Sequence, residues 1–300
     1  MKSKFEKILC PIDFTDNSLR ALDQAIELAR SNDALLYLMN VEFVPDNMAE
    51  VRHYVSVSTE GPRTQLEQIA RKRLAGVRHQ VVVDAGRPAE LIEKAAGNLA
   101  VDLIVMATHG RTGVEHFFLG SVAEHVVRSA VCPVLTLGPG ARLAGLKKIL
   151  CPIDFDQNSI DALKLAFRLA AQNDAELTVL HVDTLPFEPS EIPVRQPLPE
   201  WKKDALAQMQ ALIDENLGTE AACELVVEQG DAARNIMEVA ADLRPDLIVM
   251  ATHGPTGLGH FLLGSVAERT VRESPVPVIT IRASKAYVVA GEKEKLPTSA

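Results

Sequence analysis

The sequence predicts an α/β protein made of two tandem copies of one domain, each with an open and mostly parallel β-sheet. The first reason is a long repeat: residues 102–124 (DLIVMATHGRTGVEHFFLGSVAE) return 144 residues later as 246–268 (DLIVMATHGPTGLGHFLLGSVAE). Residues 7–14 (KILCPIDF) likewise recur at 148–155. Apolar strands also alternate with helices of about 10 to 15 residues, which is typical of right-handed βαβ units. So large a repeat indicates a duplicated domain rather than a solenoid.

The first copy is predicted to contain five strands, each marked by a short apolar run. The strands are 7–12, 35–41, 80–84, 102–106 and 133–137. Between them apolar residues recur at helical spacing, as at Leu19, Leu22 and Ile26 in the first helix. The predicted helices are 17–30, 66–77, 88–99 and 121–129. Residues 43–61 show no clear period and are expected to form a loop or lid.

The second copy repeats this order. Its predicted strands are 148–153, 177–182, 224–228, 246–250 and 276–281, and its predicted helices are 159–171, 201–216, 232–243 and 265–273. We therefore expect domain 1 over residues 1–140 and domain 2 over residues 147–284. A linker at 141–146 joins them, and a flexible tail at 285–300 follows.

Composition indicates a globular protein of the cytoplasm. Apolar residues make up 47% of the chain, the formal net charge is −9, and no run approaches the roughly 18 apolar residues of a membrane span. The net negative charge argues against nucleic acid as a partner. The four cysteines form no CxxC pair, so buried, reduced thiols are expected rather than a metal or redox site.

Each long repeat joins a buried strand to a helix through a glycine loop. Gly110 and Gly254 open the two loops, and after nine intervening residues Gly120 and Gly264 each precede a serine and a helix. Glycines let the backbone approach a ligand or adopt positive φ, and the first turn of a helix offers unpaired N–H groups. This arrangement predicts a phosphate site in each copy.

The serines after these glycines have a second interpretation. Ser121 with Glu124, and Ser265 with Glu268, have the spacing of a capping box, in which serine is the N-cap and glutamate the third helical residue. Capping alone would contribute about 1 kcal/mol to stability. The glycine spacing, identical in both copies, favours phosphate.

Three predicted strands of each copy end where a parallel sheet binds ligands. The residues at these ends are Asp13, Val41 and Ala107 in the first copy and Asp154, Val182 and Ala251 in the second. An aspartate here could accept hydrogen bonds from a ribose hydroxyl or a base amine. The alternative is that each aspartate caps the next helix or accepts hydrogen bonds from loop N–H groups.

The remaining polar residues of the loops predict no catalytic chemistry. His109 and His253 could donate to a phosphate, but a histidine bonded to nearby backbone is the commoner arrangement. Arg111 could neutralise phosphate in the first copy only, because Pro255 replaces it in the second; a solvated arginine is the alternative. No pair of nucleophile and base stands out, and no cluster has metal-ligand spacing.

These motifs resemble the universal stress protein family in its tandem two-domain form. The resemblance covers both halves. It rests on PIDF near the start of each copy and on VMATHG followed, after nine residues, by GSVAE. It implies five parallel strands in the order 3-2-1-4-5 with helices on both faces, a fold like that of the adenine nucleotide alpha hydrolases. The family's nucleotide-binding branch carries Gly-x-x-Gly, nine residues and Gly-Ser/Thr around ATP. Here Ala107 and Ala251 replace the first glycine of that pattern.

The resemblance implies ATP, with or without Mg²⁺, as the ligand of residues around these motifs. In the first copy they are Pro11, Ile12, Asp13, Val41, Met106, Ala107, His109, Gly110, Arg111, Gly120, Ser121 and Val122. In the second they are Pro152, Ile153, Asp154, Val182, Met250, Ala251, His253, Gly254, Gly264, Ser265 and Val266. Family members also pair through their fifth strands, so the two domains are expected to pair there, and a homodimer is a further assembly that the resemblance allows.

Three functional hypotheses follow. The first is an ATP-binding stress-response or signalling protein that changes shape or partner with nucleotide. The second is an interaction module of the same fold, whose loops are structural and bind no nucleotide. The third, an ATP-using enzyme such as an adenylating ligase, is disfavoured because residues 14–18 after the first strand contain no glycine. Slow incidental ATP hydrolysis would not make the protein a dedicated enzyme.

Overall fold

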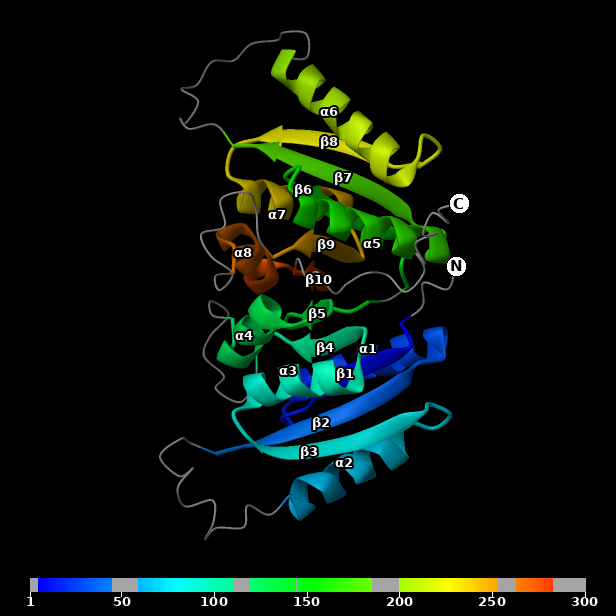
Figure 1. Cartoon of the computed structure of the whole chain (residues 1–300), viewed down its shortest axis with the longest axis vertical. Coiled ribbons are helices and arrows are strands. Elements are labelled where there is room, and N and C mark those ends of the chain that lie inside the picture. The colour runs from blue at the N-terminus through cyan, green and yellow to red at the C-terminus, as the bar shows by residue number, and fades with distance from the viewer. Residues whose placement is uncertain are drawn as a thin grey trace, which may run out of the picture.

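A computed structural model describes residues 5–44, 59–109, 119–143, 145–184, 200–252 and 263–282. The molecule is elongated, with the two repeats placed end to end along its long axis (Figure 1). The first repeat contains β1 (Lys7–Pro11), α1 (Asp16–Asn32), β2 (Leu35–Phe43), α2 (Glu60–Arg73), β3 (His79–Gly86), α3 (Pro88–Leu99), β4 (Leu103–Ala107), α4 (Ser121–Ser129) and β5 (Val134–Leu137). The second contains β6 (Lys148–Ile153), α5 (Gln157–Asn173), β7 (Glu176–Asp183), α6 (Glu200–Leu217), β8 (Glu224–Gln229), α7 (Ala232–Leu243), β9 (Leu247–Ala251), α8 (Ser265–Glu273) and β10 (Val278–Ile281).

The strands form one sheet in the order β3-β2-β1-β4-β5-β10-β9-β6-β7-β8. Within each repeat the pairing is parallel and the order is 3-2-1-4-5, so the predicted fold class is confirmed. The predicted pairing of the fifth strands is also present, because β5 and β10 are antiparallel neighbours. The two five-stranded sheets are therefore continuous across this seam.

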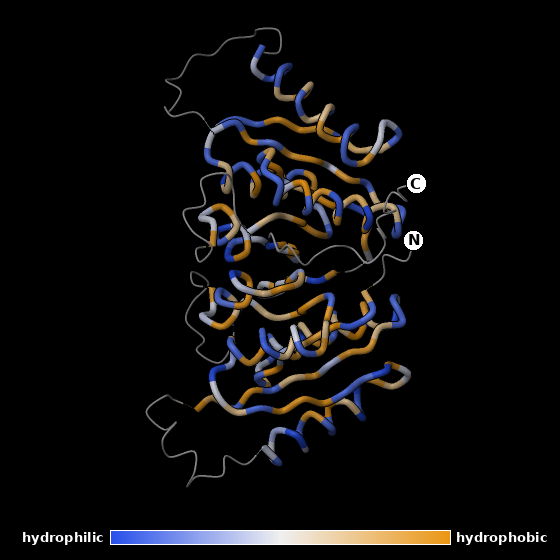
Figure 2. Tube along the Cα trace, in the orientation of Figure 1, coloured by the Kyte–Doolittle hydropathy of each residue, from blue (hydrophilic) through white to orange (hydrophobic). Residues whose placement is uncertain are grey.

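Helices cover both faces of the sheet, as alternating side chains on the strands require. On β4, for example, Leu103 and Val105 face the core beneath α1 and α2, whereas Ile104 and Met106 face the core beneath α3 and α4. The second repeat places α5 and α6 on the first face and α7 and α8 on the other. Figure 2 shows the strands as mostly hydrophobic and the helices as mixed. Strands buried on both faces explain the continuous apolar runs in the sequence.

Capping residues set the first helix of each repeat. Thr15 caps α1 by accepting a hydrogen bond from the Ser18 N–H, and Asp156 caps α5 by accepting one from the Asn158 N–H. The predicted bounds around α2 are wrong: residues 43–61 were expected to be a loop or lid and 66–77 a helix, yet β2 extends to Phe43 and α2 runs from Glu60 to Arg73. Tertiary packing of Leu66 and Ala70 in the core overrides the weak helix propensity of that first turn. The loop segment 45–58 lies outside the described residues.

Candidate functional site

The chain reverses direction across the sheet between β1 and β4. After β1 it moves outward to β2 and β3, then returns to add β4 on the other side of β1. Such a switch point leaves a crevice beyond the carboxyl ends of the two strands, where ligands of open α/β sheets bind. The same reversal occurs between β6 and β9 in the second repeat.

A backbone hydrogen bond holds the start of α4 at this crevice. The Gly120 N–H donates to the Thr108 carbonyl at 2.8 Å, directly after β4, and the Gly264 N–H donates to the Thr252 carbonyl at 2.9 Å in the second repeat. Thr108 is fixed in turn, because its N–H donates to the Leu137 carbonyl at 3.0 Å. Each glycine therefore brings the amino end of a helix to the carboxyl end of the fourth strand.

Close approach explains why position 120 is glycine. A Cβ built there would lie 2.9 Å from the Thr108 carbonyl oxygen, closer than real side chains come. The expectation that such glycines supply positive φ does not hold for Gly120 or Gly264, whose φ angles are −60° and −62°. Ala107 and Ala251 end β4 and β9 in extended backbone, so replacing the family's glycine with alanine there causes no φ strain.

The capping-box interpretation of the serines is wrong. Gly120 and Gly264 are the N-caps, Ser121 and Ser265 are the first helical residues, and neither helix has a side-chain cap. The glutamates of the expected capping boxes pair with arginines one turn later in their own helices. Glu124 lies 3.9 Å from Arg128, and Glu268 lies 3.7 Å from Arg272. The first-turn N–H groups have no partner within their helix, and both serine side chains are exposed.

The two aspartates after the first strands accept hydrogen bonds from the loop. Asp13 Oδ1 accepts the Thr15 N–H at 3.0 Å and the Thr15 hydroxyl at 2.6 Å, and Asp154 Oδ1 accepts the Asp156 N–H at 3.1 Å. The alternative in which each aspartate accepts hydrogen bonds from loop N–H groups is therefore present. These bonds are made by Oδ1 of each aspartate. Asp13 and Asp154 remain at the crevice with half-buried side chains.

The residue after each aspartate has an unusual backbone conformation. Phe14 and Phe155 have φ angles of 65° and 64°, in the left-handed region that bulky side chains rarely adopt. Such conformations persist only where surrounding structure holds them, and they cluster at functional sites. Their recurrence at equivalent positions marks this turn as a constrained part of each crevice.

A difference between the repeats lies beside this turn. The Asn40 side-chain amide donates to the Ile12 carbonyl at 2.7 Å, whereas in the second repeat His181 Nδ1 lies 3.1 Å from the Ile153 carbonyl. Because a carbonyl only accepts, Nδ1 carries the proton of that imidazole. The His181 ring also packs on Phe155, with centroids 4.4 Å apart. Asn40 keeps a buried carbonyl oxygen without a hydrogen-bond partner among the described residues.

The structure gathers most other predicted residues at the same ends. Pro11, Ile12, Val41 and Met106 lie at the carboxyl ends of β1, β2 and β4, and Val122 lies in the first turn of α4; Pro152, Ile153, Val182, Met250 and Val266 occupy the corresponding places. His109 follows Thr108, whose side-chain hydroxyl lies 2.8 Å from His109 Nδ1, so Nδ1 of this histidine is bonded to a neighbouring side chain rather than to the backbone. Gly110, Arg111, His253 and Gly254 lie outside the described residues.

In the described parts of the chain the cysteines are free thiols, and metal-ligating side chains are not clustered. No group of three His, Cys, Asp or Glu side chains there could hold a metal ion. Cys10, Cys132 and Cys151 are buried free thiols, and burial raises their pKa values, that of Cys132 to about 12. The helices described here include none that is long and apolar enough to cross a bilayer.

Comparison with known proteins identifies the family. The sequence model of the universal stress protein family matches the chain twice, over residues 4–137 and 145–282. The chain belongs to the universal stress protein family. A universal stress protein of Methanocaldococcus jannaschii is 36% identical over a match of 146 residues, and the match covers 44% of this chain and 82% of that protein. One from Thermus aquaticus is 36% identical over 133 residues, which are 44% of this chain and 97% of that protein.

A solved structure spans both repeats. The crystal structure of a universal stress protein from Archaeoglobus fulgidus covers 93% of this chain and 98% of its own, with a TM-score of 0.73 and 23% sequence identity. At that identity the likeness shows the fold alone. This universal stress protein is therefore a tandem member whose two-repeat architecture occurs in a crystal structure.

Two features of the site in this universal stress protein were not predicted from sequence. Thr108 and Thr252 anchor the glycine-capped helices through their carbonyls, and the only signal was their repetition within VMATHG. Phe14 and Phe155 adopt positive φ, which nothing about phenylalanine suggests. Both depend on backbone geometry rather than on side-chain type.

Proposed function

We propose that each repeat binds an adenine nucleotide, with ATP as the ligand, in the crevice at its switch point. The observation that carries the proposal is the hydrogen bond from Gly120 to Thr108 and its counterpart from Gly264 to Thr252. These bonds hold two glycine-capped helix starts at the place where open parallel sheets bind ligands. Unpaired first-turn N–H groups and the positive end of the helix dipole favour a phosphate there.

The surroundings of the helix start support an anionic group. Ser121 and Ser265 add exposed hydroxyl groups at the first helical position, where they can donate to a phosphate oxygen. Glu124 and Glu268, which would repel phosphate, lie near arginines further along their helices. Within the described residues this leaves each amino end free of a bound carboxylate.

The other end of the crevice suits the nucleoside. Asp13 and Asp154 stand at the ends of the neighbouring strands β1 and β6, where a carboxylate oxygen can accept a hydrogen bond from a ribose hydroxyl or an adenine amine. Val41 and Val182, at the ends of β2 and β7, offer apolar surface for the base. Mg²⁺ would accompany the phosphates rather than occupy a cage built by protein side chains.

At the level of the cell, we infer a stress-response or signalling protein of the cytoplasm that acts through nucleotide-dependent conformation or partner choice. The family and the duplicated site support this inference. The alternative is an interaction module of the same fold that binds no nucleotide. The differing side chains at positions 40 and 181 favour unequal affinities of the two repeats, because they line otherwise matching turns.

Calorimetric titration with ATP, with and without Mg²⁺, tests the proposal. We expect the purified protein to release ATP on denaturation, or to bind it at micromolar concentration at two unequal sites. Gly120→Ala should abolish one site and Gly264→Ala the other, whereas Gly97→Ala, where a Cβ meets nothing within 4 Å, should retain both.

Two results would contradict the proposal. Undetectable binding at millimolar ATP, with folding verified by circular dichroism, would reject nucleotide binding and leave the interaction module. Glycine variants that lose stability while binding ATP as tightly as the unchanged protein would place the nucleotide elsewhere. Two identical sites would contradict the inferred inequality of the repeats.

A further inference from the structure

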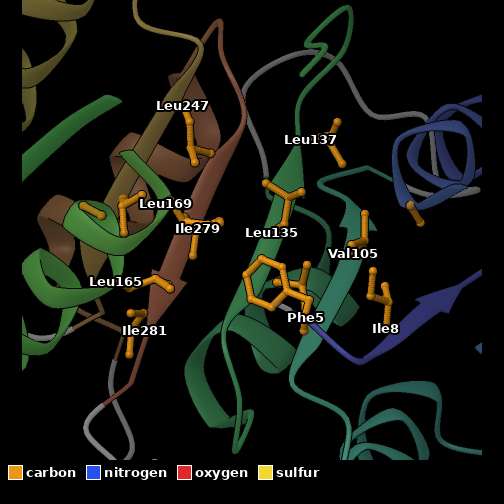
Figure 3. Packing of buried hydrophobic residues seen from close by; sticks show 14 of the residues in the cluster. Phe5, Ile8, Val105, Leu135, Leu137, Leu165, Leu169, Leu247, Ile279 and Ile281 are labelled. Carbon is orange, nitrogen blue, oxygen red and sulfur yellow. The ribbon is translucent and has the colours of Figure 1, made fainter. Parts of the chain in front are cut away.

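A groove crosses the seam between the repeats on the face that carries α1 and α5. Its volume is about 530 Å³. The floor is apolar and comes from Leu103, Leu135, Leu247 and Ile279 on the four central strands. Figure 3 shows Leu135 and Ile279 close together at the centre, with Leu169 on one side and Phe5 on the other. This volume lies within the range of natural binding pockets.

The groove has the internal symmetry of the chain. Leu135 and Ile279 are equivalent residues that lie opposite each other in the β5–β10 pairing, so a pseudo-twofold axis passes between them. Leu28 of α1 and its equivalent Leu169 of α5 line the two sides. The two halves of the groove are therefore built around equivalent positions of the two repeats.

One side is covered by the chain that leaves β5. After Leu137 the linker turns over α1: Ala141 is buried, and the Leu143 N–H donates to Gln24 Oε1 at 2.7 Å. Leu143, Gly145 and Leu146 then line the groove. The linker thus fills part of the groove before it enters β6.

The same sequence offset identifies the counterpart of this linker. Residues 144 positions after Leu143, Gly145 and Leu146 are Tyr287, Val289 and Ala290, in the chain that leaves β10. They belong to the run 286–290 (AYVVA), which is apolar throughout and lies beyond the described residues. The position equivalent to that of the linker over α1 is a position over α5.

The surface of α5 suits an apolar segment. Gln24, which bonds the linker backbone, is replaced at its equivalent position by Leu165, and Leu169 follows one turn later. Arg168 Nε, between them, is buried without a hydrogen-bond acceptor among the described residues. A main-chain carbonyl of a docked segment would supply that acceptor, just as the Leu143 N–H of the linker supplies a donor to Gln24 Oε1.

The chain is long enough to make this contact. The last described residue is Arg282, three residues after Ile279 of the groove floor. An extended chain spans at most about 3.6 Å per residue, so residue 286 lies within about 14 Å of Arg282. Because α5 packs directly against β9 and β10, its surface is within that reach.

We propose that residues 286–290 dock into the groove against α5, as the pseudo-twofold counterpart of the linker on α1. From the sequence, residues 285–300 were expected to be a flexible tail. In this proposal residues 286–290 are docked, and only the residues after them form a free tail. Tyr287 fills the half of the groove opposite Leu143, and its ring supplies the large apolar area that such a contact needs.

Amide hydrogen exchange on the full chain, followed by mass spectrometry, tests this docking. We expect the amides of 286–290 to exchange at least about tenfold more slowly than those of 294–300. Tyr287→Asp combined with Val289→Asp should remove that protection and increase binding of an apolar fluorescent dye, because the groove floor becomes accessible. Tyr287→Phe should retain the protection.

A charge-matched double variant further along the tail is the control for the docking experiment. Thr298→Asp combined with Ser299→Asp adds the same charge to the same tail and should change neither protection nor dye binding. Continued protection of the β10 amides in every variant shows that the fold is intact. Equal exchange across 286–300 in the unchanged protein would overturn the proposal. So would protection that disappears on dilution, because the segment would then be seated in a second copy of the chain.

Discussion

Leu135 of β5 lies directly opposite Ile279 of β10, and the two residues hold the same place in the two repeats. Both side chains are buried, with exposures of 0% and 3%. Thr136 and Thr280 flank this pair, and each donates its hydroxyl hydrogen to a carbonyl of the other strand, at 3.1 and 3.4 Å. The seam between the repeats is therefore packed and bonded like the interior of a domain.

Truncation at the seam should destabilise the whole protein. We expect Leu135→Ala to lower the free energy of unfolding by about 2–5 kcal/mol, because it removes a fully buried side chain at the junction. Urea denaturation monitored by circular dichroism measures the change. Val131→Ala is the matched control: Val131 is 49% exposed, so its effect should stay within about 0.5 kcal/mol. Equal effects of the two variants would show that the seam contributes little to stability.

The two glycines 120 and 97 should respond to alanine in opposite directions. Gly120→Ala forces a Cβ to within 2.9 Å of the Thr108 carbonyl, and we expect a loss of about 1–3 kcal/mol through backbone displacement. Gly97→Ala lies within α3 with open space around it, so it should stabilise the protein by up to about 1 kcal/mol. Thermal denaturation of the ligand-free variants separates the two. A neutral Gly120→Ala would mean that the loop relaxes without cost.

Glu93 should make stability depend on pH. Burial raises the pKa of its carboxyl, although His125 Nε2 lies 3.3 Å from Oε1 and Arg128 and Arg282 lower that pKa in part. The folded state then binds this proton more tightly than the unfolded chain. The contribution of Glu93 to stability is therefore full below the unfolded pKa of about 4.3 and is lost as pH rises through the higher folded value.

Glu93→Gln tests this pH dependence. The glutamine side chain is uncharged at every pH, so the variant should gain stability relative to the unchanged protein as pH rises from 4 to 7. Denaturant midpoints across that range measure the difference. Glu215→Gln, at an exposed position of α6, serves as the control. A difference that shrinks with rising pH would show that the charged Glu93–His125 pair stabilises the fold instead.

The thiols should differ in reactivity. Burial raises the pKa values of all four thiols, but Cys10, Cys132 and Cys151 are buried whereas Cys223 is half-buried and accessible to a reagent. Iodoacetamide at pH 8 should therefore modify Cys223 first in the native protein and reach the other three only after unfolding. Peptide mapping by mass spectrometry measures the order, and labelling of Cys10 at the same rate as Cys223 would contradict it.

Sequence reasoning reached the fold through repetition and periodicity. The strands buried on both faces appear as continuous apolar runs, and Pro88 at the start of α3 marks a helix by its fixed φ. The family resemblance added the strand order and the pairing of β5 with β10. These features depend on residue type at regular intervals, which a sequence displays directly.

The details of the site depend on backbone geometry and were less accessible. Serine is a preferred N-cap residue, so Ser121 was a natural candidate. In the structure Gly120, whose N–H donates to the Thr108 carbonyl, is the N-cap, one residue earlier. The positive φ of Phe14 is imposed by the surrounding turn, whereas residue type alone predicts negative φ. Asn40 and His181 were not singled out, because their role lies in bonding one backbone carbonyl.

The antiparallel junction of β5 and β10 also bears on how this chain could diverge. Two separate copies of one domain would have to meet by diffusion, and each change in sequence would appear on both sides of their contact. Covalent fusion makes the encounter intramolecular, so it persists at any dilution. Fusion also ensures that two repeats of different sequence always pair with each other. One repeat can then lose or gain a ligand contact while the other keeps the original one.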